Sequence, residues 1–558
     1  FVSLLVHIYS IGYMADDDGY QRFFSYISLF TFMMLMLVTA NNFLQLFFGW
    51  EGVGLVSYLL IGFWYQKESA LQGSMKAFLV NRVGDFGFLL GIALLLAYTG
   101  SLDYSSVFNH AGYLSGETIE LFKNTPWSLL TVICLLLFVG AMGKSAQVPL
   151  HVWLPESMEG PTPISALIHA ATMVTAGVFM VARISPLIEY SVTALSVVLV
   201  IGATGALFTG ILAIVMNDIK RVIAYSTLSQ LGYMMVAMGV SAFSAGMFHL
   251  LTHACFKALL FLAAGSVIMG MHHEQDMRKM GGLWRKMPIT YITFLIGGFA
   301  LCAIPPFAGF YSKDTIIEAA QISDIPGSSY AYLCVAIGAM VTALYTFRAF
   351  FMTFHGKPRM DKESYDHVHE SPWVVWLPLV ILAIPSVILG YLLYMPMLFS
   401  KPTLLSQSLF VLPQLDVLAE IGHEVTSPLQ SMVHAFFSPI FWLTISGIAI
   451  AWICYSLFTG LPAIFSKRFR YVYLILQNKY GFDAFNNLMF VKGAKGMGRF
   501  FYSIGDQTLI DGFFVNGSAR LINWFSFKSR TVQSGYLYHY ITVMVLSILG
   551  FLCWLLLG

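Results

Sequence analysis

Long apolar stretches recur along almost the whole chain and constrain its fold more than any other feature. A helix of about 18 or more apolar residues can cross a hydrocarbon core of about 30 Å, and such windows follow one another through most of the 558 residues. Hydrophobic residues make up 58% of the chain and charged residues only 10%, as expected for a protein dissolved in lipid. The sequence therefore predicts an all-α polytopic membrane protein.

We expect thirteen spans, at residues 26–47, 48–65, 76–98, 127–148, 161–183, 192–216, 222–240, 243–268, 289–320, 330–354, 373–396, 438–460 and 536–557. The chain begins without Met in the middle of an apolar run. We interpret residues 1–25 as the remnant of an N-terminal span and its loop, so the sequence is expected to be N-terminally incomplete.

The basic residues support this threading because they fall almost wholly on one side. Loops on the first side (side A) contain 22 of the 30 Lys and Arg residues, whereas loops on the opposite side (side B) contain only Lys123 and Lys401. The remaining six lie in or at the ends of spans. The positive-inside rule assigns side A to the cytoplasm, or to the matrix of an organelle.

Two groups of five spans form an expected inverted repeat, residues 26–183 and 192–354. Five is odd, so the second unit enters the membrane from the opposite face. In each unit the fourth span combines a lysine with helix-breaking proline: Lys144 with Pro149, and Lys313 with Pro305 and Pro306. Paired broken helices in inverted halves indicate an ion path through a transporter. The alternative is accidental symmetry, since Pro and Gly are frequent in membrane helices.

Ionisable side chains inside these spans are the candidate functional groups, because a charge at the bilayer centre costs at least about 2.5 to 3.5 kcal/mol. Glu51 needs a cation, for which Arg82 and Lys144 are the candidates, and Asp85 opens the same span as Arg82. A static ion pair that locks two helices is the alternative. Unlike Arg, a buried Lys can lose its proton.

His249, His253 and Lys257 follow one another at intervals of four residues and should share one helix face. Such a stripe suits a proton relay, because imidazole both donates and accepts protons near neutral pH. Structural hydrogen bonding between helices, or a metal or cofactor site, are the alternatives. His169 follows the first broken helix, where it is either a packing residue or a group that passes a proton inward from Lys144. The hypothesis is a row of protonatable groups near mid-membrane.

The remaining features predict no redox centre in this chain. The six cysteines are scattered through apolar spans without a C-x-x-C pair or a His at ligand spacing, so we interpret them as packing residues.

Two additional spans are expected within 373–460. Residues 470–530 alternate polar and apolar positions at helical spacing and predict a lateral amphipathic helix, broken at glycines such as Gly481, Gly493 and Gly505. A terminal anchor follows at 536–557.

Long strings of the chain resemble the subunit L family of respiratory complex I, the proton-pumping NADH:quinone oxidoreductase. They include WEGVGLVSYLLIGFW, GKSAQVPLHVWLPESMEGPTPISALIHAATMVTAGVF, HLLTHACFKALLFLAAGSVI and GFYSKD. The resemblance implies an antiporter-like membrane subunit of sixteen spans, of which this chain lacks the first two and most of the third. It also implies that the following residues occupy the family's proton-channel positions: Glu51, Arg82, Asp85, Lys144, His169, His249, His253, Lys257, Lys313 and Asp314.

The resemblance further implies a translocase driven by redox chemistry in other subunits. NADH, FMN, iron–sulfur clusters and quinone are then expected in those partners and no cofactor in this chain. The lateral helix is expected to contact neighbouring antiporter-like subunits, or else to cover its own bundle. We expect a multi-pass protein of a bacterial inner membrane, with the mitochondrial inner membrane as the alternative. The competing function is that of the main subunit of an Mrp-type monovalent cation/proton antiporter. A redox subunit with its own quinone or haem is disfavoured because no ligands are paired on facing helices.

Overall fold

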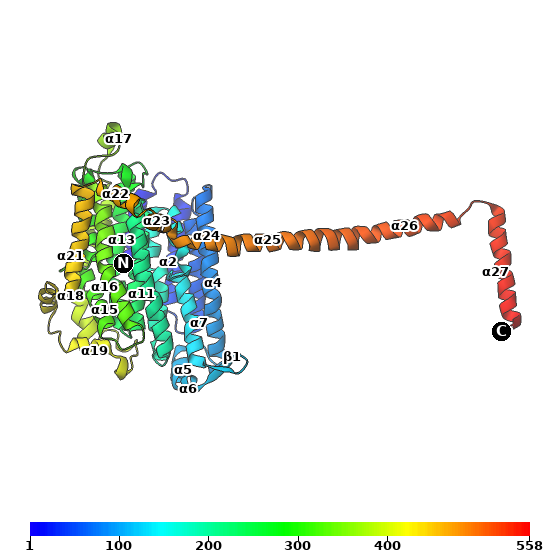
Figure 1. Cartoon of the computed structure of the whole chain (residues 1–558), viewed down its shortest axis with the longest axis horizontal. Coiled ribbons are helices and arrows are strands. Elements are labelled where there is room, and N and C mark those ends of the chain that lie inside the picture. Colours follow the sequence, from blue (N-terminus) through cyan, green and yellow to red (C-terminus); the bar gives the residue numbers. More distant parts are fainter. Residues whose placement is uncertain (558) are drawn as a thin grey trace. The chain divides into compact units, whose positions relative to one another are not determined.

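The computed structural model describes residues 1–557, apart from the side chains of residues 121 and 122. Within them the chain is almost entirely helical, and the only sheet is a two-stranded antiparallel hairpin of β1 (Thr118–Phe122) and β2 (Thr125–Ser128). Two compact units are present, Phe1–Tyr480 and Gly481–Gly558. The first unit is a bundle of helices that run side by side (Figure 1). The predicted all-α membrane architecture is therefore confirmed.

The first predicted repeat is built from helices of very different length. They are α2 (Tyr20–Val38), α3 (Phe43–Ile61), α4 (Glu68–Thr99), α7 (Leu129–Lys144), α8 (Thr162–Ala166) and α9 (Ala176–Arg183), preceded by α1 (Val2–Tyr13) and interrupted by α5 (Tyr104–Asn109) and α6 (Ala111–Gly116). The first turn lies at residues 39–42 rather than at the expected 47/48 boundary. Asn42 explains the shift, because its side chain accepts the Gln45 N–H at 2.7 Å and caps α3.

The second predicted repeat is built from longer helices. They are α11 (Val192–Val215), α12 (Ile219–Gly239), α13 (Phe243–Gly270), α14 (Pro288–Leu301), α15 (Ala308–Ile322) and α16 (Ser328–Phe354), with the short α10 (Ser185–Ile188) before them. Almost every residue of α12 and α13 is buried. Polar side chains in these two helices therefore face protein rather than lipid.

The fourth helix of each predicted repeat is interrupted, as the prolines indicate. In the first repeat α7 ends at Lys144 and is followed by two 3-10 turns, Leu150–Trp153 and Pro155–Glu159, before α8 begins. We call residues 150–159 the break loop. In the second repeat the interruption lies between α14 and α15, at residues 302–307. A π-helical turn at Leu167–Ala171 contains His169, and such turns occur frequently at functional sites.

Glycine allows the helices around Lys144 to pack closely. A Cβ atom on Gly84 of α4 would lie 2.9 Å from the Cα of Gly143 on α7, which is too close for any side chain. Association of helices in lipid depends on such small residues, since no hydrophobic force draws the helices together there. The close approach brings the end of α7 against the middle of α4.

The remainder of the first unit comprises α17 (Lys362–His367), α18 (Trp373–Tyr394), α19 (Val417–Gly422), α20 (Pro428–Ala435), α21 (Pro439–Trp452), α22 (Leu461–Arg468) and α23 (Arg470–Gln477). Ten helices of 18 or more residues within the described chain are long and apolar enough to cross a membrane, and three shorter apolar helices accompany them. The ten do not include α12, whose polar content is accommodated by burial.

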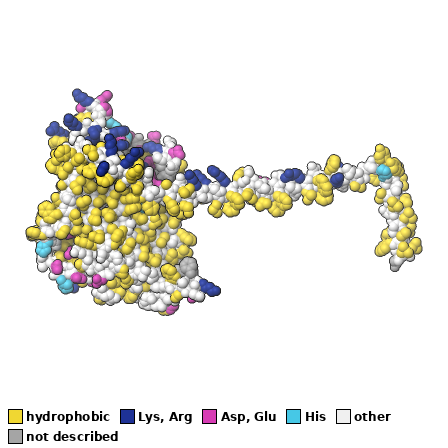
Figure 2. Space-filling model, in the orientation of Figure 1, with side chains coloured by type: hydrophobic (Ala, Val, Ile, Leu, Met, Phe, Trp, Pro, Cys, Tyr) yellow, Lys and Arg dark blue, Asp and Glu magenta, His cyan; other side chains and the backbone are white. Residues whose placement is uncertain are grey.

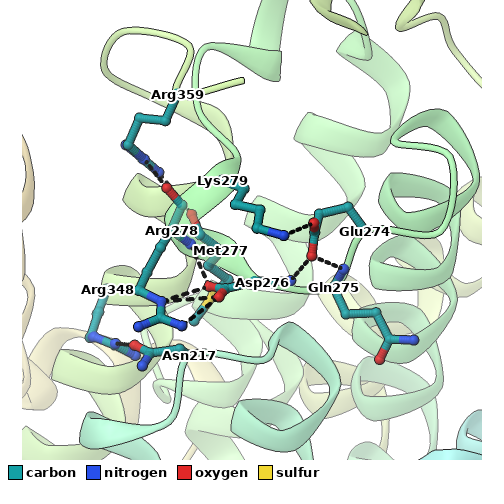
Figure 3. A network of polar contacts seen from close by, with 9 residues as sticks. All are labelled: Asn217, Glu274, Gln275, Asp276, Met277, Arg278, Lys279, Arg348 and Arg359. Atoms are coloured by element: carbon teal, nitrogen blue, oxygen red, sulfur yellow. Dashed lines mark hydrogen bonds and ion pairs between the residues drawn. The ribbon is translucent and has the colours of Figure 1, made fainter. Parts of the chain in front are cut away.

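Basic side chains gather at one end of the bundle, near α17 and α22, above a broad hydrophobic belt on the visible face (Figure 2). Polar contacts link several loops at this end (Figure 3). Arg348 on α16 donates to the Asn217 side chain at 2.9 Å, and Arg359 donates to the Met277 carbonyl at 2.9 Å. Asp276 accepts hydrogen bonds from the Arg278 side chain at 2.6 to 3.0 Å. This network closes the side A end of the second repeat.

The second unit is a helical segment followed by an apolar helix. The segment contains α24 (Phe482–Asn486), α25 (Gly493–Phe500) and α26 (Asn516–Val532), joined by π-helical stretches at Asn487–Lys492 and Phe501–Val515, and α27 (Leu537–Leu557) follows. The expected breaks at Gly493 and Gly505 are wrong, because helix runs through both; the interruption lies at residues 479–481, where Gly481 has φ +79°. A glycine inside a helix costs only about 1 kcal/mol relative to alanine, which is too little to end one.

Candidate functional site

A cluster of four ionisable side chains lies where α3, α4 and α7 meet. Glu51 of α3 forms an ion pair with Arg82 of α4. Asp85, one turn further along α4, lies 3.6 Å from Arg82 and 3.2 Å from the Lys144 amine. Asp85 and Lys144 are buried, whereas the Glu51 and Arg82 side chains are 24% and 34% exposed. One carboxylate is thus shared between an accessible cation and a buried one.

The neighbours of Lys144 differ in part from the expectation. Of the two candidate cations for Glu51, Arg82 forms the ion pair. Lys144 pairs with Asp85 instead. The other oxygen of Asp85 accepts the indole N–H of Trp50 at 2.7 Å. The Lys144 amine also lies 5.9 Å from the centre of the Trp50 ring, a cation–π contact. Trp50 therefore orients the carboxylate that neutralises Lys144.

The break loop connects the end of α7 to His169. The indole N–H of Trp153 donates to the Gly143 carbonyl at 3.0 Å, directly beside Lys144. Ser157, four residues further along the loop, lies 2.9 Å from the Nε2 of His169. No hydrogen bond or ion pair within residues 1–557 joins His169 to Lys144, so Ser157 is the partner instead.

His253 joins the two predicted repeats. Its Nδ1 lies 3.0 Å from the carbonyl of Ala170, the residue after His169, and its ring centre lies 6.1 Å from that of His249. His249 contacts Gln230 of α12 at 3.2 Å and Ser312 of α15 at 2.9 Å. The two histidines thus form a buried connection from the π-helical turn to the residue before Lys313.

The two lysines of the second repeat have hydroxyl partners instead of carboxylates. Lys257 donates to the Ser226 hydroxyl and lies 3.4 Å from the Ile223 carbonyl. Lys313 donates to Thr342 of α16 at 3.3 Å, and its amine lies 4.5 Å from the centre of the Tyr233 ring. Neither lysine forms an ion pair within the described residues, so each amine is buried with neutral partners.

Asp314 opens onto a cavity that faces the loops of side B. The cavity measures about 210 Å³ and lies between α15 and residues 424–440, which include α20. Its polar lining includes Asp314, Glu318, Glu424, Gln430 and His434. The buried Lys313 is adjacent in sequence to Asp314, which places a polar chamber at this end of the row.

Sequence reasoning missed the neutral partners of the ionisable groups. Ser157, Ser226, Gln230, Ser312 and Thr342 each contact a histidine or lysine of the row. Hydroxyl and amide side chains are common in membrane helices, so no spacing distinguishes these five. The string STLSQ in α12 was the one available signal, because it concentrates polar residues in a predicted span.

Several buried polar atoms along this row have no protein hydrogen-bond partner: Nδ1 of His169, Nε2 of His253, Nε2 of Gln230 and Oε1 of Gln147. Such atoms are rare in proteins, and ordered water commonly satisfies them. They occur at three of the contacts described above, those of His169, His253 and Gln230.

Metal-binding groups are not assembled in the part of the chain that the structure describes. No cluster of three His, Cys, Asp or Glu side chains with metal-site geometry occurs among residues 1–557. The cysteines form no disulfide there. Cys134, Cys255, Cys302 and Cys334 are buried, Cys454 is half-buried and Cys553 is exposed.

Comparison with known families identifies two matching regions. Residues 40–341 match the family described as NADH:quinone oxidoreductase/Mrp antiporter, transmembrane region, and residues 1–24 match the N-terminus of NADH-ubiquinone oxidoreductase (complex I) chain 5. The first region contains all ten candidate site residues.

Curated relatives match nearly the full length of the chain. It is 56% identical to NADH-quinone oxidoreductase subunit L of Neisseria meningitidis serogroup A, with 98% of this chain and 84% of the relative covered. It is 44% identical to NADH-ubiquinone oxidoreductase chain 5 of Marchantia polymorpha, with 99% and 82% covered. Among solved structures, the Mrp complex from Dietzia sp. superposes with a TM-score of 0.71 at 24% identity, over 96% of this chain and 54% of that one. That similarity establishes the fold, whereas the identity to the curated relatives shows that the chain belongs to the NADH-quinone oxidoreductase subunit L family.

Proposed function

We propose that this chain translocates protons as a membrane-arm subunit of NADH:quinone oxidoreductase, driven by redox chemistry in other subunits. The observation that best supports the proposal is the polar connection between the two repeats, from His169 through the Ala170 carbonyl to His253 and His249. Hydrogen bonds between helices stabilise a membrane bundle, but a buried series of successive histidines offers more than that. It is suited to proton transfer, because imidazole can accept a proton on one nitrogen and donate from the other.

The proposed path has three parts. The cluster of Glu51, Arg82, Asp85 and Lys144 lies at one end, the histidines lie in the middle, and Lys313 with Asp314 lies beside the side B cavity. Water bridges the intervals that no side-chain contact spans, satisfying the unpartnered nitrogens of His169 and His253. Lys257 lies one turn after His253 on α13.

Asp85 supplies a switch for the first part of this path. It lies 3.2 Å from Lys144 and 3.6 Å from Arg82, so a small movement changes which cation it neutralises. When Asp85 pairs with Lys144, the amine keeps its proton. When Asp85 turns toward Arg82, the buried amine loses its counter-ion and releases the proton.

The same proposal places the redox chemistry and its cofactors elsewhere. NADH, FMN, iron–sulfur clusters and quinone belong to partner subunits, and this chain contributes no redox centre. Its partners are the other subunits of the complex, with neighbouring antiporter-like subunits contacted by the lateral segment of residues 482–532. Identity to bacterial subunit L proteins favours a bacterial inner membrane, with side A in the cytoplasm.

Substitution of Lys144 by Ala tests the proposal directly. We expect vesicles that contain the assembled variant to oxidise NADH while taking up fewer protons per NADH than wild type. Normal proton uptake in Lys144→Ala would remove this residue from the path. Sodium-dependent proton exchange by the isolated chain would instead favour the function of an Mrp-type antiporter.

A further inference from the structure

The last two residues of the first unit, Lys479 and Tyr480, are linked to the break loop by side-chain contacts. Lys479 forms an ion pair with Glu156, a residue of that loop. Tyr480 stacks on Phe208 of α11 with ring centres 3.6 Å apart and planes within 16°, and its hydroxyl donates to the Phe208 carbonyl at 3.2 Å. The Phe208 ring also lies edge-on to His151, 6.4 Å away, in the break loop. We call these contacts of Lys479 and Tyr480 the latch.

The backbone at the latch adopts a costly conformation. Lys479 and Tyr480 have φ angles of +50° and +55°, followed by Gly481 at +79°. Non-glycine residues are disfavoured in the left-handed region, because their Cβ atom comes too close to the backbone. Such conformations persist only where surrounding contacts determine them, and they concentrate at functional sites. The ion pair and the aromatic stack are the contacts that hold this turn.

Glu156 is the anionic centre of the latch. Besides Lys479 it faces Arg221 of α12 at 3.5 Å, and Arg221 also contacts Glu159 at 3.2 Å. Burial alone would raise the pKa of Glu156, but the charges of Lys479, Arg221 and Lys76 lower it below its usual range. The carboxylate therefore remains charged and keeps its partners at neutral pH.

The residue after Glu156 contacts the row of protonatable groups. Ser157 lies 2.9 Å from Nε2 of His169, and Trp153 of the same loop donates to the carbonyl beside Lys144. The break loop therefore contacts the latch through Glu156, and it contacts His169 and the backbone beside Lys144 through Ser157 and Trp153. Glu156 and Ser157 are adjacent in the backbone, so a shift of the loop backbone at Glu156 also moves Ser157.

We propose that Lys479 and Tyr480 are positioning residues for proton transfer through His169, which they control through the break loop. This inference rests on the proposed function. The helical segment 482–532 follows the latch directly in the chain. Lys479 and Tyr480 are the last residues of the first unit, so every contact of the latch lies within that unit.

Lys479→Met, compared with a control variant, tests this inference in the assembled complex. The matched control is Lys467→Met, because Lys467 is exposed and lies before the lateral segment. The readout is the number of protons moved per NADH oxidised in membrane vesicles. We expect Lys479→Met to lower this ratio about two- to fivefold, the factor that a partly exposed ion pair contributes. Lys479→Arg should retain the wild-type ratio, because it keeps the cation.

Tyr480→Phe provides a second variant in case Lys479→Met does not assemble. It removes one hydrogen bond and keeps the stack, so we expect a smaller loss in the same direction together with faster deuterium exchange at residues 150–159. A wild-type ratio and unchanged exchange in both variants would overturn the inference. The proposed function would stand in that case if Lys144→Ala still failed to pump, so the two failures are distinguishable.

Discussion

At the scale of single residues, the candidate path combines ionisable groups with neutral partners that determine what each can do. Lys144 has a carboxylate partner, whereas Lys257 and Lys313 have hydroxyls. A buried amine with a carboxylate is stabilised in its charged form, and one with only hydroxyls is stabilised much less. The three lysines share a residue type but differ in environment. We infer that Lys144 gains and loses its proton with the position of Asp85.

Gly54 of α3 provides the space that Lys144 occupies. A Cβ atom at this position would lie 2.7 Å from the Lys144 amine. We expect Gly54→Ala to displace the amine from Asp85 and to lower proton uptake per NADH, measured in vesicles. Gly112→Ala is the control, because a Cβ atom there meets nothing within 4 Å. Equal pumping by the two variants would show that the Lys144 position is not critical.

At the scale of elements, the interruptions of helices matter more than the helices themselves. The break after α7 brings Trp153 and Ser157 into the interior, and the π-helical turn leaves the Ala170 carbonyl available to His253. In a regular helix, a backbone carbonyl such as that of Ala170 would accept a hydrogen bond from an N–H of the same helix. The loops that connect elements also contain titratable groups outside the spans, of which Glu189 is the clearest example.

Glu189 follows α10, between the two predicted repeats, and predicts a pH dependence of stability. The side chain is buried, and the N–H of Leu412 donates to it at 2.9 Å. Burial raises the pKa of Glu189 to about 7 from its usual 4.5. The folded state therefore binds a proton that the unfolded state releases. The contribution of Glu189 to stability is fully present below pH 4.5 and is lost as the pH rises through about 7.

Glu189→Gln should remove this dependence, because the amide still accepts the Leu412 N–H and never ionises. The shift corresponds to roughly 3 kcal/mol at most. We expect the variant to unfold at a higher temperature than wild type at pH 8 and at a similar temperature near pH 5. The measurement is thermal unfolding of the purified assembly between these values. A parallel decline of both proteins with pH would exclude Glu189 as the cause.

At the scale of the whole molecule, charge asymmetry and burial together define how the chain spans the bilayer. Most basic residues belong to the loops of side A, and Lys123 and Lys401 are the two on side B. The cavity beside Asp314 faces the side B loops and is lined by carboxylates instead of cations. We infer that protons leave or enter the second repeat through that cavity.

Thiol labelling tests the orientation. In a background with Cys454 and Cys553 replaced by Ser, we expect Lys123→Cys to react with a membrane-impermeant maleimide added outside intact cells. Lys362→Cys should react only after the membrane is opened. Both positions are exposed, so accessibility of the side chain does not limit the reaction. Labelling of Lys362→Cys in intact cells would reverse the assignment of side A.

The sequence alone determined the helical membrane fold, the two breaks at proline and the ionisable residues, because each follows from local hydrophobicity, from proline or from the cost of burying charge. Tertiary structure decided which groups meet. Asp85 rather than Glu51 is the partner of Lys144, Ser157 contacts His169, and Lys479 reaches Glu156 across 323 residues of sequence. Such pairings depend on the rotation and depth at which helices pack against one another. Small residues such as Gly84 and Gly143 allow close packing, but the periodicity of the sequence does not specify the rotation or the depth.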